Sequence, residues 1–151
     1  MANSPATTKI NKGDAAEEER LSKNHSSVIV RFSIASGNVR DATKYLAGGD
    51  AMVGIWERVW ADHKTDRSVL QYHILGAPHH CSWRSLSSES WSESNGKAEV
   101  SPDARKALGQ ALAGAIVVAS SKPVVDDDDD PPCIGAKRVY RSEERRVGKE
   151  C

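Results

Sequence analysis

The apolar residues of this chain fall into short segments whose period changes along the sequence, and this change constrains the fold more than any other feature. Residues 28–34 alternate between apolar and polar side chains, which predicts a strand with one buried face. A turn-prone Ser-Gly-Asn follows at residues 36–38, and residues 43–47 predict a second strand. The two segments therefore predict a β-hairpin.

A helical period replaces the alternation after the hairpin. Gly48 and Gly49 end the second strand, and Asp50 is predicted to cap a helix. The apolar residues of this helix share one face: Met52, Val53, Trp56, Val59 and Trp60. Residues 69–75 alternate again and predict a third strand, which stops at Gly-Ala-Pro.

The second half of the chain repeats the alternation of loop, helix and strand. Residues 82–95 have loop composition, with Trp83 and Trp91 as anchors. Ser101 and Pro102 predict the start of a helix that runs to Gly114, and residues 115–119 predict a short buried strand. This order of elements predicts an α/β or α+β fold with a mixed sheet flanked by helices.

The two ends of the chain are set apart by composition. Residues 1–24 are polar, contain no apolar run of membrane-spanning length, and predict a flexible arm. Residues 141–151 are similar to the in-frame translation of a common sequencing adapter, which predicts a non-native and disordered tail. We therefore expect one domain over residues 25–140.

Charge and cysteine content restrict the partners and the compartment. The 21 basic and 21 acidic residues balance, so no electrostatic partner is implied. Without the tail, Cys81 and Cys133 remain, which are too few for a disulfide framework, so we expect a cytoplasmic protein that does not enter a membrane.

Two motifs lie at the ends of predicted strands. Residues 45–51 read Tyr-Leu-Ala-Gly-Gly-Asp-Ala, and residues 75–82 read Leu-Gly-Ala-Pro-His-His-Cys-Ser. One helix and one strand separate them. In this order the region from about Ser26 to Ala119 resembles the second half of competence-type metallo-β-lactamase domains.

The resemblance implies a four-layered αββα sandwich of which this chain holds half. It also implies a site for two zinc ions with Asp50 as a metal ligand. One of His79 and His80 is the other ligand, with His80 preferred over His79, and the remaining histidine contacts the substrate or its leaving group. Imidazole nitrogen and carboxylate oxygen suit zinc. A two-metal site favours hydrolysis of a phosphodiester, either a small molecule or a nucleic acid.

The first half of that family carries the motif His-x-His-x-Asp-His, and none of the five histidines of this chain lies in such a spacing. We therefore expect an incomplete site and an inactive chain, whose function belongs to the parent protein. Alternatives are a non-catalytic α/β interaction module and a truncated gene prediction with no independent function. Asp50 alone is explained by helix capping, and His79 and His80 by an exposed loop. Cys81, where the family has Gly, is either a buried thiol or an additional ligand.

Overall fold

The computed structural model describes residues 27–147, and its core is a mixed four-stranded sheet. The strands are β1 (Val30–Ser36), β2 (Val39–Ala47), β3 (Tyr72–Gly76) and β4 (Ala111–Val118), and they lie in this order across the sheet. β1 and β2 form the predicted antiparallel hairpin, whereas β2, β3 and β4 are parallel. The α+β class and the mixed sheet predicted from the sequence are confirmed. The predicted arm over residues 1–24 lies outside the described residues.

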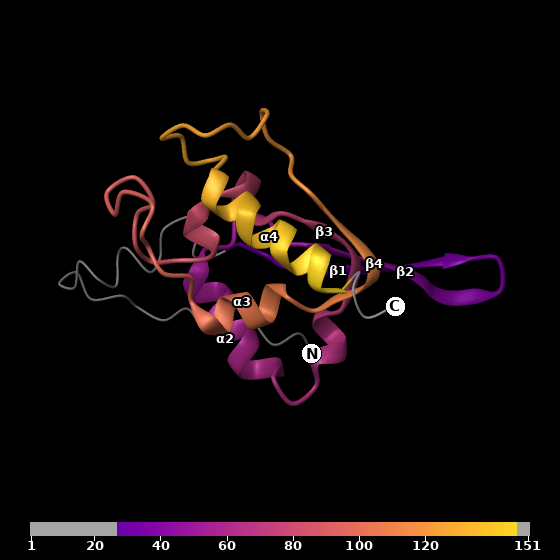
Figure 1. The fold of residues 1–151 in the computed structure, drawn as a ribbon. Helices are drawn as coiled ribbons and strands as arrows, with labels where there is room; N and C mark the ends of the chain where they lie inside the picture. Colours follow the sequence, from indigo (N-terminus) through magenta and orange to yellow (C-terminus); the bar gives the residue numbers. More distant parts are fainter. Residues whose placement is uncertain (1–26, 148–151) are drawn as a thin grey trace, which may run out of the picture.

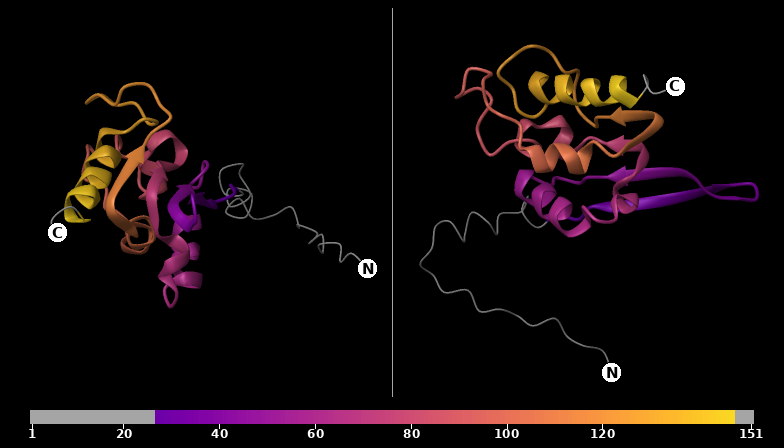
Figure 2. Two further views of the ribbon diagram at one scale, coloured as in Figure 1. Left: turned by 90° about the vertical axis from the view of Figure 1, so that its right-hand side faces the viewer. Right: turned by 60° about the horizontal axis from the view of Figure 1, so that its bottom comes forward.

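Three helices pack on one side of this sheet. They are α2 (Val53–His63), α3 (Pro102–Leu108) and α4 (Ile134–Val147), and Figures 1 and 2 show all three on the same side, with α4 along β4. Leu46 of β2 and Leu75 of β3 point to this side and are almost completely buried, as is Trp56 of α2. The hydrophobic core therefore lies between the sheet and its single helical layer.

The opposite face of the sheet is apolar and uncovered by any helix among the described elements. Cross-strand partners point to the same face, and the register places Phe32, Tyr45, Ile74 and Ile116 in one row across the four strands. We call this surface the bare sheet face, and it consists of Val30, Phe32, Ile34, Tyr45, Ala47, Ile74, Ile116 and Val118. Phe32 and Ile116 remain about half exposed, at 50% and 52%.

Two predicted burial patterns are therefore wrong. The strand predicted at residues 28–34 was expected to bury one face, but every residue of β1 is exposed. The strand predicted at residues 115–119 was expected to be buried, but β4 is an edge strand with Ile116 and Val118 half exposed. Alternation shows which side chains share a face, but it does not show whether another layer covers that face.

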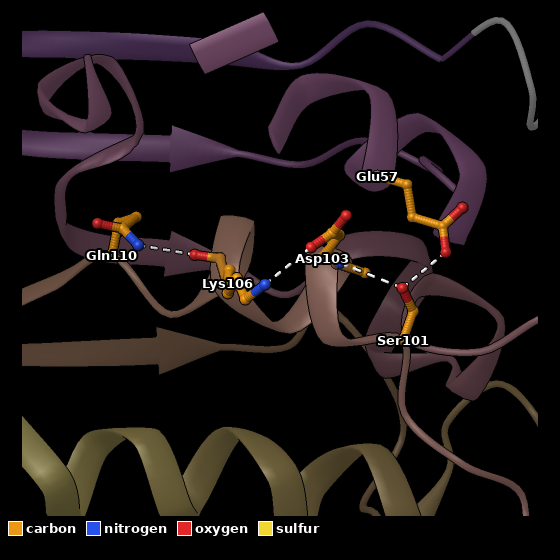
Figure 3. A network of polar contacts seen from close by, with 6 residues as sticks. Glu57, Ser101, Asp103, Lys106 and Gln110 are labelled. Atoms are coloured by element: carbon orange, nitrogen blue, oxygen red, sulfur yellow. Dashed lines mark hydrogen bonds and ion pairs between the residues drawn. The ribbon is translucent and has the colours of Figure 1, made fainter. Parts of the chain in front are cut away.

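The helix α3 begins as the sequence predicts. Ser101 is its N-cap, accepting a hydrogen bond from the Ala104 amide, and Pro102 is its first residue. The Ser101 hydroxyl also donates to Glu57 of α2 over 2.6 Å, so the cap joins two helices (Figure 3). On the outer face of α3 the Lys106 ammonium donates to Asp103.

The end of α3 and the start of α2 differ from the predictions. α3 ends at Leu108 with Gly109 as its C-cap, and Gly114 instead lies inside β4 with a φ of +74°. The Gly109 amide donates to the Arg105 carbonyl and closes the last turn, and the earlier stop leaves residues 111–113 free to extend β4. At α2 the N-cap is Met52, which makes no side-chain cap hydrogen bond, so the predicted capping role of Asp50 is wrong.

The third strand also begins later than predicted. Arg67–Leu70 forms a 3-10 turn, η2, and β3 starts only at Tyr72. The side chain of Asp66 accepts a hydrogen bond from the Ser68 amide, which is the local interaction that favours a turn over a strand. The loop after β3 is anchored as expected, since the rings of Trp83 and Trp91 lie 4.7 Å apart.

The prediction of a disordered tail is wrong for residues 141–147. α4 continues through this segment to Val147, and the buried carboxylate of Glu143 accepts hydrogen bonds from Arg105 of α3 at 2.9 and 3.0 Å. Residues 148–151 lie outside the described part of the chain. None of the helices within residues 27–147 is long and apolar enough to cross a membrane.

Candidate metal centre

Asp50, His79 and His80 come together at one edge of the sheet. Asp50 follows the end of β2, and the two histidines follow the end of β3. Because β2 and β3 are parallel neighbours, their carboxyl ends meet at the same edge. The sheet topology therefore brings two motifs that lie about 30 residues apart to one place.

The histidine loop has an unusual backbone. His79, His80 and Cys81 all have positive φ values, of 48°, 55° and 69°. This left-handed conformation costs about 1–3 kcal/mol for each residue that is not glycine. It persists only where the surrounding structure enforces it.

Several contacts enforce this conformation. The His79 amide donates to the Gly49 carbonyl over 2.8 Å, and the Cys133 amide donates to the Cys81 carbonyl over 2.9 Å. Pro78 is buried against Gly48, where a Cβ atom would lie only 2.8 Å from the proline Cβ. The strained loop is therefore held directly against the Gly-Gly-Asp segment.

The orientation of His80 follows from its hydrogen bond. Nδ1 lies 2.9 Å from the Ser120 carbonyl oxygen and 3.2 Å from the Ser120 hydroxyl. A carbonyl oxygen only accepts, so Nδ1 carries a proton and donates it. In the neutral ring Nε2 is then an unprotonated acceptor, which is the arrangement found in histidines that bind metals.

Nε2 of His80 points toward the Asp50 carboxylate. The distance from Nε2 to Oδ1 is 3.6 Å, which is longer than a hydrogen bond, and both side chains are about half exposed. With a neutral imidazole, two acceptor atoms face each other. A cation between them, either a proton on Nε2 or a metal ion, makes this arrangement favourable.

His79 lies beside this pair but is oriented differently. Its ring centroid is 6.4 Å from that of His80 and the rings are tilted by 55°. His79 is partly buried, whereas His80 is exposed. The structure thus places His80, rather than His79, opposite Asp50.

Cys81 points away from the pair into the core. It is 3% exposed and lies close to Cys133, and both cysteines are free thiols. Burial raises the pKa of Cys81 to about 11, with a further contribution from Cys133. Cys81 is therefore part of the core, and within residues 27–147 it does not gather with Asp50 and His80 into a group of three metal-ligand side chains.

The remaining histidines lie elsewhere. His63 ends α2, and His73 accepts a hydrogen bond from the Lys44 amide. Within residues 27–147 no group of three or more His, Cys, Asp or Glu side chains converges in the way that a complete metal site requires. Sequence reasoning missed Ser120, because a residue that acts through its backbone carbonyl has no signature in a motif.

Comparison of the chain with protein-family models, with curated proteins and with solved structures finds no match in any of the three.

Proposed function

We propose that this chain is the C-terminal half of a zinc-dependent hydrolase of the metallo-β-lactamase superfamily that cleaves phosphodiesters, either small molecules or nucleic acids. The facing of His80 Nε2 and Asp50 Oδ1 across 3.6 Å carries the proposal. The Ser120 carbonyl holds the imidazole so that its Nε2 atom faces a carboxylate. These are the donor atoms that zinc takes from proteins.

The spacing of the pair fits a shared ion. Two ligands on a tetrahedral zinc ion, at bond lengths of about 2.0–2.1 Å, are separated by roughly 3.3 Å. The observed 3.6 Å is close to this value. Asp50 and His80 would hold the metal, and His79 would lie beside it and contact the substrate.

The bare sheet face supports the proposal that the chain is half of a sandwich. In an αββα arrangement each sheet has helices on its outer face and packs its inner face on the other sheet. This chain has helices on one face and exposed apolar residues on the other. The face is thus suited to pack against a second sheet that the same fold would supply.

The chemistry divides between the metal and the protein. A bound zinc pair polarises a phosphoryl oxygen and lowers the pKa of water. The residues of this chain orient that chemistry: Ser120 fixes the tautomer of His80, and the hydrogen bond from the His79 amide to Gly49 fixes the loop relative to Asp50. Because none of the five histidines of this chain lies in the spacing His-x-His-x-Asp-His, the chain alone is expected to be inactive.

A non-catalytic α/β interaction module is the second candidate. The absence of a group of three or more ligand residues within residues 27–147 favours it. For either candidate we propose the cytoplasm as the compartment, because Cys81 and Cys133 are free thiols.

Zinc titration of the chain tests the proposal. We expect weak, saturable binding, detected as shifts of the His80 imidazole signals by NMR, that is lost in Asp50→Ala and in His80→Ala. His63→Ala removes a histidine at the far end of α2 and serves as the matched control. Zinc binding that survives both site substitutions, or no shift at His80, would refute the metal role and leave an ordinary Asp–His ion pair.

Extending the source gene upstream tests the remaining part of the proposal. The proposed hydrolase requires His-x-His-x-Asp-His upstream of the hairpin. A complete gene that lacks this motif would rule out the hydrolase and favour the interaction module.

A further inference from the structure

The backbones of Cys81 and Cys133 are in direct contact, although the two residues lie far apart in the sequence. The Cys133 amide donates a hydrogen bond to the Cys81 carbonyl over 2.9 Å. An amide nitrogen lies about 1.46 Å from its own Cα atom, and a carbonyl oxygen lies about 2.4 Å from its own. The two Cα atoms are therefore at most about 6.8 Å apart, and disulfides join Cα atoms separated by roughly 4.4–6.8 Å.

The two side chains also lie in the same part of the core. Cys81 is 3% exposed and Cys133 is 0% exposed, and both belong to the one hydrophobic cluster between the sheet and its helices. Cys133 contributes to the raised pKa of Cys81, an effect that one thiol exerts on another only over a short distance. The two thiols are therefore neighbours in the core as well as along the backbone contact.

A small cavity gives access to one of the two cysteines. Cys81 lines a space of about 200 Å³ between β4 and α4, together with Ala77 of the same loop and Val117 of β4. A molecule the size of water needs only about 15 Å³, so hydrogen peroxide, which is little larger, fits there. Cys133 is not among the residues that line this cavity. Cys81 is therefore the thiol that a small oxidant meets first.

Cys133 lies where a thiol is helped to act as a nucleophile. It directly precedes Ile134, the first residue of α4. Burial raises the pKa of Cys133, and hydrogen bonds to its sulfur from the amides of Ala136 and Gly135 act in the opposite direction. Amides at a helix N-terminus stabilise a thiolate, so these hydrogen bonds favour the reactive form of Cys133.

We propose that Cys81 and Cys133 are a modification site, at which a peroxide converts the two thiols into a reversible disulfide. The Cys81 sulfur attacks one peroxide oxygen, the O–O bond breaks, and a sulfenic acid and one water form. The Cys133 sulfur then attacks the sulfenic sulfur, the S–O bond breaks, and the oxygen leaves as a second water with the remaining thiol proton. The bond fastens the histidine loop to the start of α4, and the proposal stands whether or not Asp50 and His80 hold zinc.

Mass spectrometry after treatment of the folded chain with hydrogen peroxide tests the bond. Cys151→Ser serves as the background, because it leaves Cys81 and Cys133 as the only thiols. We expect a loss of about 2 Da per chain and a cross-link between the tryptic peptides 68–84 and 107–137, both reversed by dithiothreitol. In Cys133→Ser the cross-link should be lost, and dimedone should trap Cys81 as a sulfenic acid. Oxidation without this cross-link would overturn the proposal.

Thermal unfolding shows whether the native fold accommodates the disulfide, and it does not require the Cys133→Ser variant to fold. The oxidised Cys151→Ser chain should unfold about 10 °C above the same chain in its reduced form, because the bond closes a long loop in the unfolded state. Peroxide-treated Cys81→Ser, Cys151→Ser is the matched control and should show no such rise. An oxidised chain that unfolds at the same or a lower temperature than the reduced chain would show that the two cysteines are not positioned for this bond.

Discussion

Gly48 and Pro78 determine how closely the two site motifs approach. A Cβ atom on Gly48 would lie 2.8 Å from the Pro78 Cβ and 3.0 Å from the Trp56 ring. All three residues are buried, so none has room to move aside. The glycine is thus required by contact with a neighbouring loop, and not by its own backbone angles.

Replacing Gly48 by alanine should therefore destabilise the chain by about 1–3 kcal/mol. Gly54→Ala is the matched control, because a Cβ atom there meets nothing within 4 Å and the helix α2 gains about 0.5–1 kcal/mol from alanine. Urea unfolding of both variants measures the difference. If both substitutions change the free energy of unfolding by the same amount, Gly48 does not pack closely against Pro78.

Buried thiols also set a pH dependence. The pKa of Cys81 is raised to about 11 by burial, above the ordinary value of 9.0. Below pH 9 the Cys81 thiol is protonated in both the folded and the unfolded chain, so its contribution to the stability of the fold is fully present. Between about pH 9 and 11 the unfolded chain loses this proton first, so stability falls as pH rises.

Urea unfolding at pH 8 and pH 10.5 tests this sign. We expect the parent chain to lose more stability between these two values than Cys81→Ala does. Burial also raises the pKa values of Cys133 and Tyr140, so these two residues should keep part of the pH dependence in the variant. An identical loss in both proteins would place Cys81 in contact with solvent.

At the scale of elements, the N-cap of α3 does two tasks. The Ser101 hydroxyl accepts from the Ala104 amide and donates to Glu57, so it starts α3 and connects it to α2 (Figure 3). Ser101→Ala should cost about 1–2 kcal/mol, at the upper end of the range for lost caps. Glu57→Gln keeps the Ser101 cap and should lower the free energy of unfolding by less, as measured by urea unfolding. A larger loss of stability in Glu57→Gln than in Ser101→Ala would show that the hydrogen bond between α2 and α3 matters more than the cap.

The local signals predicted elements well where their chemistry is local. The hairpin, the cap at Ser101 and the one-faced helix with Trp56 and Trp60 were all predicted from short patterns and are confirmed. The end of α3 was predicted wrongly because Gly109 and Gly114 both fit a helix stop in sequence. Only the pairing of β4 with β3 decides between them.

The candidate site was predictable only in part, because it also depends on which strands pair. The two motifs could be placed at strand ends, but their meeting depends on β2 and β3 being parallel neighbours. The three left-handed residues and the Ser120 carbonyl depend on tertiary contacts that no motif records. Asp50 was expected to be a helix cap as well as a ligand, and Met52 takes the capping position instead.

At the scale of the whole molecule, the bare sheet face is the largest departure from a self-sufficient domain. Phe32 and Ile34 on β1 and Ile116 and Val118 on β4 are each half exposed at the two edges of one sheet face. Contiguous apolar surface of this kind marks an interface in soluble proteins. The chain alone is therefore expected to self-associate and to bind the apolar dye ANS.

The double variant Phe32→Lys, Ile116→Lys tests whether this face is responsible. Both side chains are half exposed, so the substitutions should change the free energy of unfolding by less than about 1 kcal/mol while they reduce ANS fluorescence and self-association in analytical ultracentrifugation. Val125→Lys is the matched control, because Val125 is equally exposed, at 53%, but lies on the acidic loop after β4 and not on the sheet. If the double variant associates as strongly as the control, another surface drives association. If instead the double variant unfolds, the bare sheet face is already covered in solution by another part of the chain or by a second copy.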